Sequence, residues 1–380
     1  MSSPDLVVIG GGVIGLSAAW RCAQRGLDVV VCDPEPGEHA THASAGMLAP
    51  ITEAHYGEED LLRLNLASAA RWPGFAADLV EAIGQPVGYR PCGSIAVALD
   101  ADDNRALDDL DAYHQRLGLA SERLGSTATR ELEPLLNPRV RGGLAVEGDH
   151  SVDNRLLAEA LRAVADSGAF DLHTSAVARV AVEGGRATGV ETTNGERVDA
   201  PLVLLAAGAW SGSINGVPPE ARPPVRPVKG QIIRFQGPAD PLLLSRHIRG
   251  LVKGRHLYLV TRTSGRIVAG ATVEEQGYDT TVTAGAVQEL LSDAIELVPA
   301  LAELELVETL AGLRPGTPDN APIVGRTGID GLLVATGHFR NGVLLAPITA
   351  EAVVGLATDG DLPAEASAMD PARFQERATV

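Results

Sequence analysis

The sequence LVVIGGGVIG at residues 6–15 decides the fold of this chain. Its first four residues are apolar and predict a buried strand, and residues 16–25 predict a helix that ends at Gly26. A second apolar run, 27–32, leads directly to Asp33. Strand, glycine turn, helix, strand and acid follow one another in the order that binds the ADP group of a dinucleotide.

Each glycine of this fingerprint has its own role in the predicted site. Gly10 permits the tight turn, Gly12 lets the backbone approach a pyrophosphate, and Gly15 lets the helix pack closely on the strand. The free N–H groups at the N-terminus of the helix favour phosphate. Asp33 stands near the roughly 20-residue offset of the acid that binds ribose hydroxyls. The alternative is a glycine-rich turn in an α/β domain that binds no nucleotide.

The composition describes a globular protein with an acidic surface. The 380 residues suffice for two domains, at about 150 residues each. Hydrophobic residues make up 45% of the chain and charged residues 21%. The 31 basic and 49 acidic side chains give a net charge of −18, which repels nucleic-acid phosphates and anionic lipids. Neither nucleic acid nor a membrane is therefore an expected partner.

Cysteine usage indicates a reducing compartment. The three cysteines, Cys22, Cys32 and Cys92, show no CxxC spacing, and the first two are expected to be buried thiols. No signal peptide is expected, because Asp5 precedes the first apolar run and no basic region comes before it. The charge-free stretch 6–20 is too short to span a bilayer. We expect a cytoplasmic protein.

The rest of the chain alternates between two kinds of pattern. Residues 202–205 are wholly apolar and precede small residues at 206–210, which is typical of a central parallel strand whose carboxyl end faces a ligand. Five prolines between 218 and 227 predict a linker. The other predicted elements are helices at 60–83, 101–117, 154–167, 284–297 and 343–357, a hairpin or meander at 177–197, and strands at 94–99, 231–235, 256–260, 266–270 and 332–335.

This organisation predicts an α/β fold (α+β overall) with a discontinuous Rossmann-like FAD-binding domain and an inserted, mostly antiparallel β substrate domain. A nucleotide domain that begins at the N-terminus and closes at the C-terminus favours FAD over NAD, because nicotinamide enzymes more often keep this fold in one piece. The predicted FAD-binding domain comprises residues 1–86, 147–221 and 315–380. The substrate domain comprises 87–146 and 222–314.

Five further motifs, at residues 43–50 (ASAGMLAP), 226–231 (RPVKGQ), 270–274 (GATVE), 312–317 (GLRPGT) and 337–347 (GHFRNGVLLAP), resemble the glycine oxidases of thiamine biosynthesis. These enzymes belong to the D-amino-acid oxidase-like FAD oxidoreductases. The resemblance runs from residue 6 to about residue 347, so it covers nearly the whole chain.

The resemblance implies a non-covalent FAD and an active site built on it. The reaction implied is the oxidation of glycine, sarcosine and small D-amino acids by oxygen. The products are 2-oxo acids, ammonia or an amine, and hydrogen peroxide. Besides Gly10, Gly12 and Gly15, the resemblance places on FAD Val13, Ile14, Asp33, Pro34, Ala40, Thr41, Ala45, Gly46, Met47, Val177, His338, Phe339, Arg340, Asn341, Gly342, Val343 and Leu344.

The substrate is expected to lie against Met47, Tyr258, Arg314 and Arg340, the last three being the expected catalytic residues. Val273 replaces a bulkier residue that some relatives have at this pocket position, which implies a change in pocket size. Some relatives attach flavin covalently through a His or Cys in the region of His39 and His42, which leaves covalent attachment as an alternative. Relatives are often tetramers, so the resemblance also implies a homo-oligomer.

The residue types suit this chemistry. A guanidinium binds a substrate carboxylate through two parallel hydrogen bonds, and Arg314 is expected in a rigid turn held by Gly312, Pro315 and Gly316. Tyr258 supplies a second donor, and Arg340 precedes a helix whose N-terminus favours anionic reduced flavin. Taken alone, these residues would be a surface charge, a core tyrosine and a loop cap.

No general base is evident from the sequence. His338, beside a glycine turn, and Lys229 are both expected to be structural. The alternatives to a glycine oxidase are a sarcosine or D-amino-acid oxidase, and an FAD amine dehydrogenase that uses a non-oxygen acceptor. Further alternatives are a flavin-binding subunit of a larger complex and a nicotinamide dehydrogenase. Motifs for catalytic metals or serine nucleophiles do not occur in the sequence.

Overall fold

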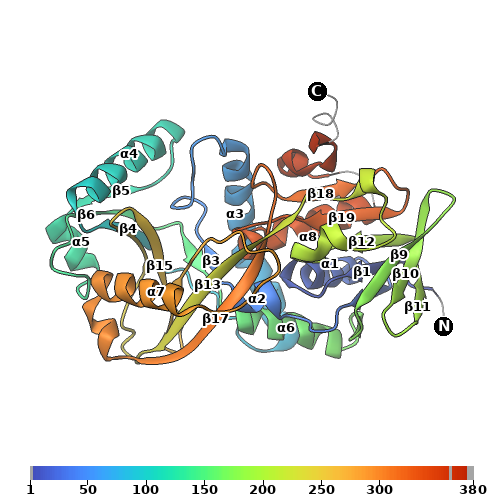
Figure 1. Cartoon of the computed structure of the whole chain (residues 1–380), viewed down its shortest axis with the longest axis horizontal. Coiled ribbons are helices and arrows are strands. Elements are labelled where there is room, and N and C mark those ends of the chain that lie inside the picture. Colours follow the sequence, from blue (N-terminus) through green and yellow to red (C-terminus); the bar gives the residue numbers. More distant parts are fainter. Residues whose placement is uncertain (1–2, 359–361, 375–380) are drawn as a thin grey trace.

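Two large β-sheets, each with its own helices, make up most of the chain (Figure 1). The computed structural model describes residues 3–358 and 362–374. A six-stranded sheet lies on the right in Figure 1 and an eight-stranded sheet on the left, and the long strands β13 and β17 reach from the second towards the first. The mixed α/β fold predicted from the sequence is confirmed.

The six-stranded sheet has β1 near its centre, with parallel β2 and β12 on either side. Only its edge strand β18 pairs in antiparallel fashion. The strand order is β18 (Ile323–Arg326), β19 (Leu332–Thr336), β12 (Leu202–Leu205), β1 (Leu6–Ile9), β2 (Val29–Cys32) and β8 (Asp171–His173).

Alternate residues of β1 and its neighbours pack on opposite faces of this sheet, as the pleat of a strand requires. Leu6 and Val8 pack in one core with helices α1, α3, α6 and α8, whereas Val7 and Ile9 pack in another with the small sheet β9–β11. Because both faces are covered, the central strands are apolar throughout. The covering elements are α1 (Val13–Gln24), α3 (Glu59–Ile83), α6 (Asn154–Asp166), α8 (Gly342–Thr358), β9 (Val177–Glu183), β10 (Arg186–Thr192) and β11 (Arg197–Asp199).

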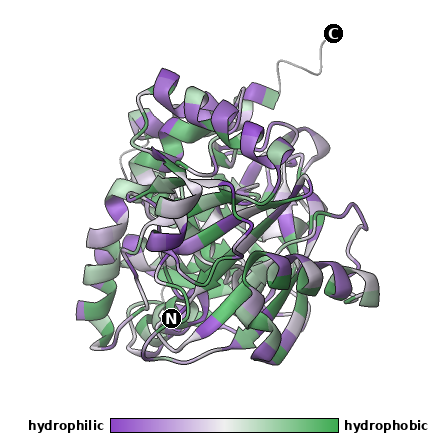
Figure 2. Cartoon of the chain, turned by 90° about the vertical axis from the view of Figure 1, so that its left-hand side faces the viewer, coloured by the Kyte–Doolittle hydropathy of each residue, from purple (hydrophilic) through white to green (hydrophobic). Residues whose placement is uncertain are grey.

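The eight-stranded sheet is antiparallel except where β4 pairs with β14. Its order is β17 (Glu305–Gly316), β13 (Arg226–Gln236), β16 (Arg266–Gly270), β15 (Arg255–Thr261), β14 (His247–Val252), β4 (Ser94–Ala98), β6 (Gly142–Val146) and β5 (Glu122–Gly125). Helices α4 (Ala101–Leu117), α5 (Ser126–Leu132) and α7 (Ala284–Leu297) pack around it. Figure 2 shows that hydrophobic residues gather in the interior and that hydrophilic residues lie on the outer faces of the helices.

Short elements join the two sheets. Helix α2 (His39–Ala43) is followed by β3 (Met47–Leu48), which pairs with β7 (His150–Ser151). The remaining elements are the 3-10 turns η1 (Gly208–Ser213), η2 (Pro219–Ala221), η3 (Pro299–Glu303), η4 (Ala364–Met369) and η5 (Pro371–Phe374).

The strand β17 runs across the predicted boundary between residues 314 and 315, and the domain limits stay a prediction. In the described part of the chain, no helix is both long and apolar enough to cross a membrane.

One local prediction is wrong: Arg314 does not lie in a glycine turn. It lies within β17, opposite Val228 of β13. The glycines serve close packing instead, because a Cβ on Gly312 would lie 2.5 Å from the Cβ of Ala43, and one on Gly316 would lie 2.9 Å from a methyl of Val228. Pro315 is tolerated because β17 is an edge strand.

The packing of α1 on β1 generates a stability prediction. A Cβ on Gly15 would lie 1.9 Å from the carbonyl oxygen of Gly10, whereas Gly74, also within a helix, has no neighbour within 4 Å. We expect Gly15→Ala to lower the free energy of unfolding by about 2–3 kcal/mol. Gly74→Ala should raise it by about 1 kcal/mol. Urea unfolding of the two variants measures both, and equal stabilities would contradict the proposed contact.

Candidate active site

A cavity of about 500 Å³ lies where the two sheets meet. Both parts of the chain line it: the carboxyl ends of β1, β2 and β12 from one sheet, and residues of β13, β15 and β17 from the other. Many of the predicted site residues come together here, namely Gly10, Gly12, Val13, Ile14, Asp33, Pro34, Ala40, Thr41, Ala45, Gly46, Met47, Val177, Tyr258, Arg314, His338, Phe339, Arg340, Gly342 and Val343.

Three of the residues predicted to bind FAD are not among those that line the cavity. Gly15 packs against Gly10, as its predicted packing role requires. Asn341 is buried beside the cavity wall. The carbonyl oxygen of Leu344 accepts hydrogen bonds from the Ser68 hydroxyl (2.6 Å) and the Trp72 indole N–H (2.9 Å), so Leu344 serves to hold α8 against α3.

The nucleotide end of the cavity is built around the N-terminus of α1. Gly12 is the N-cap residue, and its position carries no capping side chain. The Val13 N–H donates to the Thr41 hydroxyl (3.0 Å), which ties α1 to α2. Asp33 accepts from the N–H groups of Gly11 (2.6 Å) and Glu35 (2.7 Å) and is thereby fixed at the end of β2. A helix N-terminus, a backbone turn without side chains and a fixed acid fit the ADP half of a dinucleotide.

The substrate end of the cavity contains Arg314. Its Nη1 donates to the Thr272 carbonyl (3.1 Å) and lies at 3.5 Å from the Lys229 carbonyl. Gly230 makes room for the guanidinium, since a Cβ there would lie 2.2 Å from Nη1. In the described residues this guanidinium thus donates only to backbone carbonyls, and its charge remains available to an anion in the cavity.

Tyr258 stands beside Arg314. Burial raises the pKa of its phenol, although the nearby charge of Arg314 acts in the opposite direction. The phenol is therefore protonated at neutral pH and can donate a hydrogen bond. A Cβ on Gly270 would lie 2.4 Å from its oxygen, so this glycine leaves the space that the tyrosine fills.

Arg340 has a carboxylate partner that no pattern in the sequence indicates. Its Nη2 lies 3.1 Å from Glu58, which also accepts from the Asn320 amide (2.7 Å). The guanidinium lies 5.0 Å from the centroid of the Phe339 ring. A second acid, Glu53, lines the cavity and pairs with Arg249 at 2.6 Å. Both acids belong to a loop without periodicity, and their partners are more than 190 residues away in the sequence.

The histidine and lysine side chains near the cavity have structural partners. His338 is buried, its Nε2 lies 2.9 Å from the Thr349 hydroxyl, and desolvation lowers its pKa to about 3. Lys229 is buried and pairs with Asp279 at 2.8 Å. His39 lines the cavity with its ring 4.9 Å from that of Trp210, whereas His42 faces Glu38. Val273 is 68% exposed and does not line the cavity, which corrects its predicted pocket position.

Comparison with known proteins identifies the family. Residues 5–356 match the model described as FAD dependent oxidoreductase. The chain belongs to this family of FAD-dependent oxidoreductases. FAD is therefore its cofactor, as the cavity geometry and the sequence predicted.

Three individual proteins are similar to this chain over nearly its whole length. The bifunctional protein ThiO/ThiG of a Synechocystis species is 35% identical over 98% of this chain, but the chain spans only 54% of that protein. The hydrogen cyanide synthase subunit HcnC of Pseudomonas aeruginosa is 30% identical over 98% of this chain and 96% of its own length. The crystal structure of glycine oxidase from Geobacillus kaustophilus aligns with a TM-score of 0.90 at 30% identity, covering 98% of this chain and 99% of that one.

The burial of His338 predicts a pH dependence of stability. Its pKa of about 3 lies below that of an unfolded chain, so between about pH 6.5 and about pH 3 the unfolded state binds the proton and the folded state does not. The stability that the neutral His338 contributes to the folded state is complete above about pH 6.5 and is lost as the pH falls. When the pH is lowered from about 7.5 to about 5, we expect the free energy of unfolding of His338→Gln to fall by about 2 kcal/mol less than that of the parent. Urea titrations at the two pH values measure this difference. An identical loss in both proteins would refute a neutral, buried His338.

Proposed function

We propose that this chain oxidises glycine, and also sarcosine and small D-amino acids, with a non-covalent FAD and molecular oxygen. The observation that carries the proposal is the guanidinium of Arg314, which faces the cavity beside the Tyr258 hydroxyl and donates only to backbone carbonyls within the described residues. The relatives named glycine oxidase and ThiO/ThiG support the same assignment. For glycine, the products are glyoxylate, ammonia and hydrogen peroxide.

The residues of the chain bind and orient the substrate. FAD, when bound, supplies the acceptor of the hydride that leaves the substrate Cα, and its electrons pass to oxygen. Arg314 binds the substrate carboxylate in a charge-assisted, bidentate pair, and the Tyr258 phenol donates to the same group. His338 does not act as a base, because its Nε2 is engaged by Thr349 and burial lowers its pKa to about 3, which makes the ring a weak proton acceptor. The amine therefore has to arrive neutral.

Small substrates suit this end of the cavity. Met47, Tyr258 and Glu53 line the cavity. The Glu53 carboxylate is paired with Arg249, so it is not free to bind a second amine group of a larger substrate. Aromatic residues make up only 3% of the chain, so a cage for a quaternary amine is not expected. The likeness to ThiO/ThiG supports a place in thiamine biosynthesis, which stays a proposal because this chain spans about half of those proteins.

A second candidate function follows from the likeness to the hydrogen cyanide synthase subunit HcnC, which spans nearly the whole length of both chains. In this alternative the chain is a flavin-binding subunit that has no independent activity and serves within a larger complex. A sarcosine or D-amino-acid oxidase, or a dehydrogenase with a non-oxygen acceptor, is the closer variant of the main proposal.

The purified chain with FAD separates these functions in one experiment. We expect glycine added without oxygen to bleach the flavin absorbance, and air to restore it with one hydrogen peroxide released per glyoxylate. A reduced flavin that air does not reoxidise would favour the dehydrogenase. A flavin that glycine leaves oxidised would refute glycine oxidation by the isolated chain and is the result that the subunit alternative expects.

Replacing Arg314 tests the assigned anchor. We expect Arg314→Ala to lower kcat/KM for glycine at least about a hundredfold, or roughly 3 kcal/mol, because the substrate carboxylate loses its ionic partner. Arg226→Ala is the control: Arg226 lies on the neighbouring strand, pairs with the exposed Glu275 and does not line the cavity. Steady-state peroxide release measures both variants. Parent-like kinetics in Arg314→Ala would show that the carboxylate binds elsewhere.

A further inference from the structure

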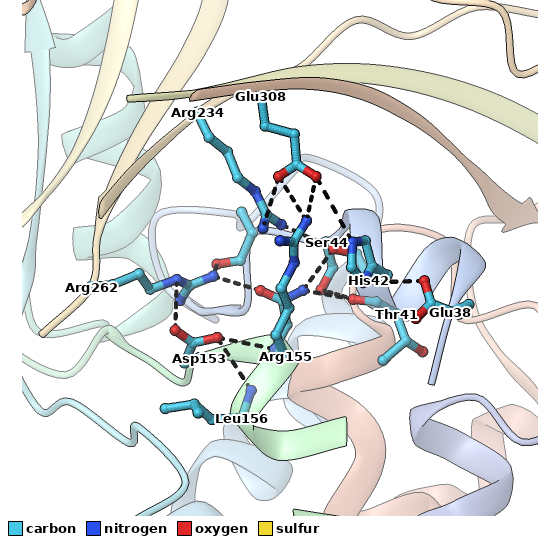
Figure 3. Close-up of polar contacts among 12 residues, drawn as sticks. Glu38, Thr41, His42, Ser44, Asp153, Arg155, Leu156, Arg234, Arg262 and Glu308 are labelled. Carbon is cyan, nitrogen blue, oxygen red and sulfur yellow. Dashed lines mark hydrogen bonds and ion pairs between the residues drawn. The ribbon is translucent and has the colours of Figure 1, made fainter. Parts of the chain in front are cut away.

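Three arginines converge on the segment Thr41–Gly46 (Figure 3), and none of them lines the cavity. Arg155 comes from the start of α6, Arg234 from β13, and Arg262 from the turn after β15. Arg234 and Arg262 are only 2% and 4% exposed. Residues of the 41–46 segment line the cavity, so these cations and the cavity lie on opposite sides of one stretch of backbone.

Two of the arginines bind this segment through its carbonyl oxygens. Arg234 Nη2 donates to the His42 carbonyl (2.9 Å), and Arg262 Nη2 donates to the Ala45 carbonyl (2.6 Å). The Asn154 amide donates to the carbonyls of Thr41 (2.8 Å) and His42 (2.9 Å), and Arg262 in turn donates to Asn154 (2.7 Å).

These bonds set the direction of the backbone dipoles. In a trans peptide the C=O and the N–H of one unit point in opposite directions. Since the Ala45 carbonyl points to Arg262, the N–H of Gly46 points the other way, towards the side on which Ala45 and Gly46 line the cavity. Gly46 is required at this point, because a Cβ would lie 2.1 Å from the Val152 carbonyl oxygen.

The cluster holds more positive than negative charge. Arg155 donates to both oxygens of Glu308 (2.9 and 2.8 Å), and Arg234 lies 3.4 Å from the same carboxylate. Asp153 caps α6 and lies 3.8 Å from Arg262. Three guanidinium groups thus face two carboxylates, while Glu38 sits half exposed at the outer edge beside His42. Within the described residues, the buried Nε atoms of Arg155 and Arg234 have no hydrogen-bond partner.

The pKa values reflect the same imbalance. Burial, and then the charge of Arg155, lowers the pKa of Arg234 to about 10, which leaves the group protonated at neutral pH. Burial opposes ionisation of Glu308, but Arg155 and Arg234 outweigh it and lower its pKa. The excess positive charge is therefore retained near neutral pH, in a buried place where salt screens it little.

We propose that Arg262 and Arg234 are positioning residues for FAD, which hold the 41–46 segment with the Gly46 N–H towards the cofactor and keep uncompensated positive charge behind it. FAD carries an anionic pyrophosphate, and both effects favour an anion. The proposal rests on the FAD cofactor of the family and is independent of which amine is oxidised. The competing explanation is that the arginine cluster is purely structural and serves only to join the two sheets.

The ion pair of Arg155 and Glu308 separates the two explanations, because its partners have opposite charges and neither side chain hydrogen-bonds to the backbone of the 41–46 segment. Glu308 lies 4.0 Å from the His42 ring and 3.4 Å from Arg234. Arg155→Gln removes a positive charge, and we expect it to raise the Kd of the full-length apoprotein for FAD about threefold. Glu308→Gln breaks the same pair but removes a negative charge, so its Kd should be equal to the parent value or lower. Quenching of flavin fluorescence measures Kd, and urea unfolding of the apoproteins measures stability.

Arg262 tests the contact with the segment. We expect Arg262→Gln to raise the Kd for FAD at least about tenfold and Arg262→Lys, which keeps the charge, to restore part of the loss. The control is Arg123→Gln at the far end of the eight-stranded sheet, where Arg123 also donates to two backbone carbonyls, those of Leu124 and Gly143. It should lower stability and leave Kd unchanged.

Two results would overturn the proposal. One is a Kd that rises in Glu308→Gln as it does in Arg155→Gln, since then only the integrity of the pair matters. The other is a parent-like Kd in Arg262→Gln despite lower stability. If Arg262→Gln does not fold, the opposed pair at Arg155 and Glu308 decides the question by itself.

Discussion

The close packing of α1 on β1 is the constraint on which the site depends. The carbonyl of Gly10 occupies the space that a side chain on Gly15 would need, so the helix can begin directly at the carboxyl end of the strand. That contact places the N-terminus of α1 on the cavity, next to Asp33 at the end of β2. The parallel pairing of β1 with β2 and β12 then fixes the ends of all three strands at one edge, which is where ligands bind in open α/β sheets.

The second half of the site reaches this edge through another close contact. Gly312 lets β17 approach Ala43 of α2, and Gly230 on the paired strand β13 leaves space for the guanidinium of Arg314. The cation that is proposed to hold the substrate is therefore fixed by two strands of one sheet, while the nucleotide end is fixed by the other sheet. Neither sheet forms the cavity alone, so the geometry of the proposed reaction depends on how the short segments between them are held.

The sequence was sufficient for those parts of the fold that depend on local pattern. The glycine fingerprint, the buried parallel strands and helices such as α4 and α7 were predicted close to their observed limits. The sequence predicts a turn at Arg314 because Gly312, Pro315 and Gly316 are typical turn residues, and only the tertiary contacts show that they serve close packing and an edge strand. The acids Glu53 and Glu58 were missed because an ion pair between residues far apart in the chain leaves no periodic signal. The buried arginines were missed for the same reason.

The net charge of −18 and the cations at the site do not conflict, because they act over different distances and in different media. Surface carboxylates are solvated, and at physiological salt their fields decay within about 8 Å. Arg234 and Arg262 are buried, so each of their charges acts through a medium of low effective dielectric on the backbone that lines the cavity. An acidic protein can therefore bind an anionic cofactor and an anionic substrate where the buried charges next to the backbone of its cavity are mainly positive. The overall charge sets which macromolecules the surface repels, and the buried arginines set what the cavity attracts.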